Sequence, residues 1–369
     1  MGIKRGVSFY SYQQTQFFKE LDLEGQIREV AQNLGGADGV EIIDEMSLHY
    51  PDPGDEFVRR WHGWMQSYGT VPVTMNVGMD VLRFRDHVMS HEECADRLRH
   101  DLRLAKRLGF ANVKCLSVVP LDIMVSALPL AEELNIRIGK EIHQPMRLDG
   151  PEVQEIQRYV QSTGTTHLGI VPDFGVFGTR PSQVQLAWFE RRGANPQACE
   201  AAVELSGLLA TGSFTHTTHT AGNIRSAFTR FLRTGSCDDG LREVFEEVRA
   251  FTDKRVPAPA EIDYTVVAEA LTLSYATGAQ LRELVPLVVS VQAKFNHMSE
   301  IPGRAGEYED IAIDTASAIE ALKEGGYNGY LNTEYEGQRY SQDRTRAEMM
   351  DEVEQVRRHH EMMRRLLAS

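Results

Sequence analysis

The chain has 369 residues, of which 42% are hydrophobic, 25% charged and 8% aromatic. This composition is typical of a folded globular protein and excludes a disordered one. Lysine and arginine number 39 against 53 acidic residues, for a formal charge of −14. Because an acidic surface repels phosphate backbones and anionic lipids, we expect neither a nucleic-acid partner nor a membrane partner.

The four cysteines lie far apart and form no Cys-x-x-Cys pair, which argues against a disulfide framework and a thiolate zinc site. The first twenty residues lack the apolar core of a signal peptide, and no run of 18 apolar residues occurs. We therefore expect a cytoplasmic protein.

Short β-like runs alternate with amphipathic helical stretches along the chain. Eight strands, each followed by a helix, is the order of a (β/α)8 TIM barrel in the α/β class. We expect one such domain to take up residues 1–369. The predicted strands cover residues 6–12, 39–46, 71–78, 112–119, 137–145, 168–176, 288–298 and 329–337.

About 110 residues separate the sixth predicted strand from the seventh, far more than a barrel unit needs. The sequence pattern of residues 178–262 predicts several helices, so we expect a helical insertion within a βα loop. Such loops build the active site of this fold, and the insertion is expected to shape substrate access or to bind a partner. Packing over the outer helices is the alternative. Near the C-terminus, the segment RRHHEMMRR (357–365) is expected to be a solvated helix face.

Polar residues follow the apolar runs of the last four predicted strands: Glu141, Asp173, His297 and Glu334. Three carboxylates and an imidazole suit Mn²⁺, Mg²⁺, Co²⁺ or Zn²⁺, and carboxylates gathered without a cation resist joint ionisation. We expect one divalent ion at these ligands, with Mn²⁺ first. The alternative is that each is a separately solvated residue or ion-pair partner. Glu336 shares a strand face with Glu334 and competes with it for the inward position.

His143 lies two residues after Glu141, so the two side chains point the same way from a strand. It is expected to act as a general base, and the alternative is that it orients a ligand. The expected catalytic residues are then His143, Glu141 and Glu334. Substrate contacts are expected from four further residues: Tyr10, His216, Glu300 and Arg304.

These residues resemble the sugar isomerase/epimerase superfamily of xylose-isomerase-like barrels. In that family a Glu, an Asp, a His and a final Glu hold one divalent metal, which match Glu141, Asp173, His297 and Glu334. The stretch GGYNGYLNTE, ending at Glu334, is the most specific part of the match.

Two departures from keto-sugar epimerases, Val176 in place of a histidine and the extra His143, together with the insertion, look more like the larger (alpha) subunit of bacterial C-glycoside deglycosidases. That resemblance implies an oligomer with a smaller β-rich partner subunit and a 3-oxo C-glucoside of a plant polyphenol as substrate. The implied reaction is metal-assisted enolisation, in which His143 takes the C2 proton and the aglycone leaves C1 by β-elimination.

Other functions stay open. The same site supports a keto-sugar isomerase or epimerase. A sugar-binding or scaffold barrel without catalysis has no need of the four polar residues. An endonuclease would want more histidines and a basic groove, and a glycosidase would use Glu141 and Glu334 as acid and nucleophile without a metal.

Overall fold

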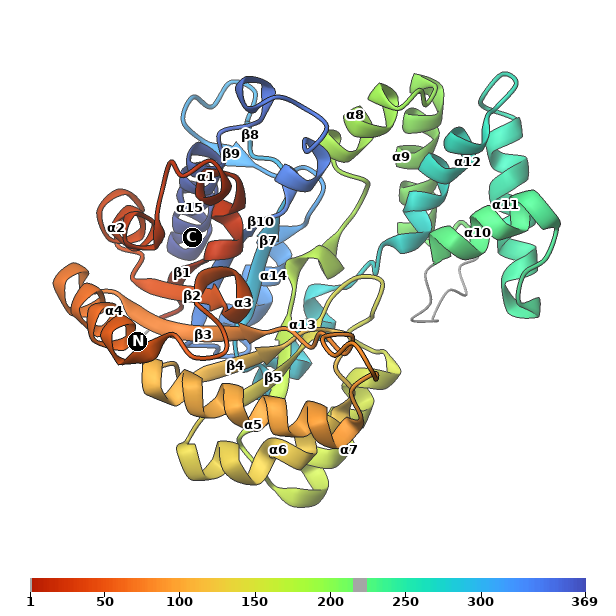
Figure 1. Cartoon of the computed structure of the whole chain (residues 1–369). Helices are drawn as coiled ribbons and strands as arrows, with labels where there is room; N and C mark the ends of the chain where they lie inside the picture. Colours follow the sequence, from red (N-terminus) through yellow and green to blue (C-terminus); the bar gives the residue numbers. More distant parts are fainter. Residues whose placement is uncertain (1, 215–223) are drawn as a thin grey trace.

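Eight parallel strands lie side by side around a barrel, with helices outside them (Figure 1). The computed structural model describes residues 2–214 and 224–369. The strand order is β6-β5-β4-β3-β2-β1-β10-β7, and the TIM barrel expected from the sequence is confirmed. The barrel strands are β1 (Lys4–Ser8), β2 (Gly39–Ile43), β3 (Val71–Val77), β4 (Asn112–Cys115), β5 (Arg137–Ile142), β6 (Leu168–Pro172), β7 (Val291–Phe295) and β10 (Tyr330–Tyr335).

The barrel closes between β6 and β7. Two isolated parallel bridges join β6 and the residue after it to β7 and the segment before it, Ile170 to Val288 and Asp173 to Gln292, and the Val289 amide donates to the Ile170 carbonyl at 2.9 Å. A Cβ atom at Gly169 would lie 2.0 Å from a backbone oxygen of the segment before β7. Glycine is therefore needed for the two segments to approach closely enough to close the barrel.

The outer helices pack their apolar faces against the strands and form one continuous core with them. Their ends carry the expected capping residues. In α5, Ser90 and Glu93 form a capping box and the left-handed Gly109 ends the helix. The outer helices are α2 (Leu23–Asn33), α4 (Gly54–Tyr68), α5 (His91–Leu108), α6 (Leu121–Leu134), α7 (Pro151–Thr163), α13 (Gly278–Leu284), α14 (Thr315–Glu324) and α15 (Glu352–Ala368).

Shorter elements follow the carboxyl ends of the strands. Several predicted strands were too long at this end, because the chain leaves the sheet there: it enters a helical or 3-10 segment after β1, β2, β6 and β10, and turns or irregular structure after the other four barrel strands. These elements are α1 (Gln13–Phe17), α3 (Asp44–Ser47) and the hairpin of β8 (Ser299–Glu300) and β9 (Tyr308–Glu309).

Between β6 and β7 the chain forms a helical lobe beside the barrel (Figure 1). Its helices are α8 (Gln183–Arg191), α9 (Pro196–Ala210), α10 (Ile224–Thr234), α11 (Asp239–Asp253) and α12 (Glu261–Ala268). They enclose a second hydrophobic core of their own, in which the Phe228 and Phe245 rings lie 5.0 Å apart. The lobe is tied to the segment after β10, since Arg191 pairs with Asp343 at 3.0 Å. Within the described ranges, no helix is both long and apolar enough to cross a membrane.

Helix α15 differs from its expected role. His359 and His360 are buried, and both lie within hydrogen-bond distance of the Thr333 hydroxyl on β10, at 3.0 and 2.9 Å. The prediction of a solvated face was therefore wrong for these two histidines. The segment has charged residues at both ends, but its middle faces the barrel wall.

Candidate active site

Charged side chains point into the barrel from several of its strands. Glu141 on β5 accepts a hydrogen bond from Lys114 Nζ on β4 at 2.7 Å, and both side chains are buried. Burial opposes ionisation of Glu141, but the charged groups around it, Lys114 first among them, together outweigh burial and lower the pKa of the carboxyl. In the same way the acidic side chains around Lys114, Glu141 first among them, together outweigh burial and raise the pKa of Lys114. The pair is therefore charged inside the barrel.

Lys294 on β7 is the centre of a second group. Its Nζ lies 2.6 Å from His143 Nε2, 2.8 Å from a Glu336 oxygen and 3.4 Å from Asp173 Oδ2. Burial opposes the ammonium form, but the Asp173 and Glu336 carboxylates outweigh it and raise the pKa of Lys294. The other Asp173 oxygen accepts from the Gly175 amide at 2.6 Å. All three ammonium protons of Lys294 therefore have acceptors.

The two glutamates at the end of β10 face the same side and behave differently. For Glu336, burial is outweighed by the groups around it taken together, Lys294 first and Arg339 among them, and its pKa is lowered to about 2. For Glu334, burial together with the nearby Asp173 and Glu336 carboxylates raises the pKa well above its ordinary value. Glu336 is therefore the ionised partner of Lys294.

His143 lies just after β5, at the rim of the barrel. Its Nδ1 is 2.6 Å from the Gln144 carbonyl oxygen. Since a carbonyl only accepts, Nδ1 carries the proton, and Nε2 presents its lone pair to Lys294. The histidine therefore has the tautomer that a general base requires.

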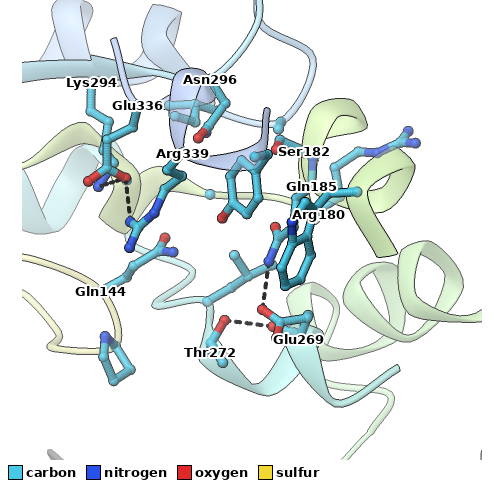
Figure 2. A pocket seen from close by; sticks show the side chains of 18 of the residues that line it. Gln144, Arg180, Ser182, Gln185, Glu269, Thr272, Lys294, Asn296, Glu336 and Arg339 are labelled. Carbon is cyan, nitrogen blue, oxygen red and sulfur yellow. Dashed lines mark hydrogen bonds and ion pairs between the residues drawn. The ribbon is translucent and has the colours of Figure 1, made fainter. Parts of the chain in front are cut away.

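A cavity of about 730 Å³ opens over this group, between the barrel and the helical lobe. Figure 2 shows Lys294, Glu336 and Arg339 at one end and Gln185, Glu269 and Thr272 at the other. At the lobe end, Glu269 accepts from Gln185 at 2.7 Å and from Arg225 at 2.5 and 2.6 Å. The cavity has the size of a small-molecule site, with a charged barrel end and a partly aromatic lobe end formed by Trp188, Phe189 and Tyr340.

The sequence-predicted site residues are only partly brought together. Glu141, Asp173, Glu334 and His143 lie in or beside the barrel mouth, and Tyr10 lines the cavity. Glu300 and Arg304 belong to the β8–β9 hairpin and are not among the cavity-lining residues: Glu300 accepts from the Gly306 amide at 2.7 Å, and Arg304 pairs with Glu307 at 3.5 Å. His216 lies outside the described residues.

His297 lies beyond the end of β7. Its backbone amide donates to Asp310 at 3.3 Å, and burial together with Arg358 lowers the pKa of its ring. In the described part of the chain, no hydrogen bond or ion pair joins His297 to Glu141, Asp173 or Glu334. The position on β7 that is in register with Glu334 holds Lys294 instead.

A divalent ion does not fit this arrangement. Within residues 2–214 and 224–369, no three or more histidine, cysteine or acidic side chains are placed so as to hold a metal. Two of the three carboxylates expected as ligands already bind lysine ammonium groups. The metal of the sequence analysis stays a prediction, and metal analysis tests it.

The two lysines are the residues of the candidate site that the sequence reasoning missed. Each stands next to the last residue of a short, largely buried strand, in NVKC and VQAKF. A buried lysine needs a partner, so a charged residue at an inward strand position was the signal that could have found them.

No protein-family model matches the chain. The chain is 28% identical over 340 residues to a C-glycoside deglycosidase alpha subunit of Arthrobacter globiformis, covering 90% of this chain and 84% of that protein. It is 25% identical over 363 residues to the 3'-dehydrocarminate deglycosidase alpha subunit of a Microbacterium species, covering 98% and 94%.

Among solved structures, D-psicose 3-epimerase has a TM-score of 0.54 at 11% identity, with both chains fully covered, and this likeness concerns the fold alone. The resemblance expected from the motifs is thus confirmed: the chain is similar in sequence to deglycosidase alpha subunits along most of its length, and in fold to the sugar epimerase barrels.

Proposed function

We propose that this chain is an enzyme that enolises a keto-sugar or 3-oxo-glycoside, and that its reaction is C-glycoside deglycosidation. The observation that carries the proposal is the barrel end of the cavity, where the unprotonated Nε2 of His143 lies 2.6 Å from the Lys294 ammonium. A base beside a cationic hydrogen-bond donor is what proton removal next to a carbonyl requires. The relatives named deglycosidase alpha subunits support the choice of reaction.

In the proposed reaction, His143 Nε2 takes the proton from C2 of the sugar. The electron pair of that bond forms the enolate with the 3-oxo group. When the enolate collapses, the carbonyl is restored, a C1–C2 double bond forms, and the C1–aglycone bond breaks. The electron pair of the C1–aglycone bond stays on the aglycone carbon, which then takes up a proton.

The cavity offers a place for both halves of such a substrate. The sugar would lie at the charged end, near His143 and Lys294, and the aromatic aglycone would lie at the lobe end, near Trp188 and Tyr340. The names of the relatives also support a partner: each is an alpha subunit, and we propose that a smaller β-rich subunit completes the working enzyme.

The test is release of the aglycone from a 3-oxo C-glucoside, followed by chromatography, with the chain alone and with a candidate partner subunit. His143→Ala is expected to abolish release while its melting temperature stays close to that of the wild type. The matched control is His91→Ala, because His91 is 70% exposed at the start of α5. Turnover retained by His143→Ala would sink the base assignment.

A second readout separates the epimerase alternative. Free keto-sugars incubated with the enzyme in D₂O would take up deuterium next to the carbonyl and change configuration if the enolate is reprotonated. Epimerisation without aglycone release would replace the deglycosidase proposal with a keto-sugar epimerase. If the protein binds the substrate but catalyses neither reaction, it is a sugar-binding barrel without catalytic activity.

A further inference from the structure

The barrel mouth holds more acidic side chains than a metal-free site would tolerate without compensation. Glu141, Asp173, Glu334 and Glu336 all point into it and all are at least largely buried. Like charges this close repel each other strongly in a poorly solvated site. Some cation must therefore balance them.

The structure supplies that cation from the chain itself. On β7, in register with Glu334, Lys294 places its ammonium between Asp173 at 3.4 Å and Glu336 at 2.8 Å. On β4, Lys114 binds Glu141 at 2.7 Å.

A divalent ion at the same carboxylates would meet these two ammonium groups. The Lys294 side chain is only 3% exposed and that of Lys114 only 2%, so both ammonium groups lie among the carboxylates and not in bulk solvent. A metal ion and a lysine ammonium would then compete for the same carboxylate oxygens, with like-charge repulsion between them.

We propose that Lys294, supported by Lys114, takes the place of a divalent cation in this site, and that the carbonyl oxygen of the substrate binds the Lys294 ammonium. The inference deepens the proposed function and rests on it for the identity of the substrate. The replacement of the metal by lysine does not depend on the identity of the substrate, because it rests on the contacts of Lys294 and Lys114 with the carboxylates.

The hydrogen bonds of Lys294 also show how the substrate would release the base. One ammonium proton points at His143 Nε2, and the other two point at carboxylates. A carbonyl oxygen that accepts the first of these protons frees the Nε2 lone pair. The freed Nε2 then takes the proton from the neighbouring carbon, and the resulting enolate oxygen stays hydrogen-bonded to Lys294. Lys294 remains an ammonium throughout, so the proton balance closes on His143.

The first test is cation binding by the full-length wild type, which needs no substrate. The protein is purified without chelator, its metal content is measured by elemental analysis, and its melting temperature is compared in EDTA and in MnCl₂. We expect far less than one ion per chain and the same melting temperature in both. One firmly bound ion per chain, with a melting temperature that falls in EDTA, overturns the proposal.

The second test removes the ammonium. In Lys294→Gln, Asp173 loses its ammonium partner and Glu336 keeps only Arg339, at 3.1 Å, so Mn²⁺ is expected to raise the melting temperature of this variant. The matched control is Lys140→Gln, because Lys140 is a buried lysine of β5 whose ammonium donates to the Val119 carbonyl and not to these carboxylates. A folded Lys294→Gln that responds to Mn²⁺ no more than Lys140→Gln does overturns the proposal. If Lys294→Gln fails to fold, the wild-type measurement decides.

Activity separates this inference from the proposed function. Aglycone release that persists in EDTA supports the lysine, and release that EDTA abolishes and Mn²⁺ restores overturns it. A metal-free wild type that neither releases aglycone nor exchanges the C2 proton, with or without the partner subunit, overturns the proposed reaction. In that case the cation-binding measurements still decide whether lysine replaces the metal.

Discussion

Lys114 and Glu141 are two buried charges that compensate each other inside the barrel. Each would be costly to bury alone, and together they form a 2.7 Å ion pair with side chains 2% and 8% exposed. Removing one partner of such a pair leaves an uncompensated charge, which typically costs about 3–5 kcal/mol, whereas replacing both partners by neutral groups costs far less.

Lys114→Met is therefore expected to lower the free energy of unfolding by about 3–5 kcal/mol, measured by urea denaturation at neutral pH. The double variant Lys114→Met, Glu141→Gln is expected to recover most of that loss. Lys323→Met, at an exposed position of α14, controls for the loss of a lysine as such. If the losses of the two single variants simply add in the double variant, the two side chains do not act as a pair.

At the scale of single elements, the sequence is informative where a strand or helix is uniform. All eight barrel strands are where the apolar runs predict them, because each run must be buried on both faces. Their ends are not predictable in the same way. The last residues of the predicted strands, such as Phe9 and Val176, are as apolar as the strand interior, yet they lie in 3-10 turns beyond the hydrogen-bonded part of the strand.

Helix α15 was misread for a related reason. Four arginines flank the HHEMM stretch and suggest a solvated helix, while the buried stripe consists of His359, His360, Met362 and Met363. A histidine can be buried in its neutral form when a hydroxyl forms a hydrogen bond with it and an aromatic ring packs against it. Here those groups are Thr333 and Phe295, whose ring stacks on that of His359 at 4.3 Å. Both partners come from strands that the local sequence of α15 does not contain.

The docking of α15 makes stability depend on pH. Burial lowers the pKa of His359 to about 3, against about 6.5 for an unfolded histidine. Below pH 6.5, His359 is therefore protonated in the unfolded chain but stays neutral in the folded chain. The stabilisation is fully present above pH 6.5 and is lost as the pH falls toward 3, at about 1.4 kcal/mol per pH unit.

His359→Phe is expected to reduce this fall, because it keeps the aromatic contact and cannot be protonated. At pH 8 the variant should lose about 0.5–1.5 kcal/mol with the hydrogen bond to Thr333. The measurement is denaturant unfolding of both proteins between pH 8 and pH 4.5, with His91→Phe as an exposed control. Parallel curves for wild type and His359→Phe would show that another group causes the acid sensitivity.

At the scale of the whole molecule, the cavity joins parts of the chain that lie far apart in the sequence. Its lining runs from Tyr10 to Gln342 and includes both barrel and lobe. The sequence predicts that the extra helices lie on the active-site side, since they interrupt a βα connection. It does not predict which of their side chains face the cavity, because the lobe has its own core and its helices are amphipathic toward that core first.

Trp188 shows how lobe and barrel would divide the substrate between them. Trp188 lies on α8 and lines the cavity. Its ring packs edge-on against that of Tyr340, which follows β10, with the ring centroids 6.2 Å apart. In the proposed function it contacts the aglycone, and His143 and Lys294 contact the sugar. An aromatic contact of this kind contributes about 0.5–1.5 kcal/mol, which corresponds to roughly a two- to tenfold change in affinity.

Trp188→Ala is therefore expected to raise KM for a 3-oxo C-glucoside by about two- to tenfold with little change in kcat, because the lost contact acts equally on the bound substrate and the transition state. Proton exchange at a free 3-oxo-sugar, which has no aglycone, should be unaffected. Trp64→Ala, on the outer helix α4, is the matched control. An equal loss on both substrates would mean that Trp188 holds the barrel end of the site in place, and the aglycone would then have to bind elsewhere in the cavity.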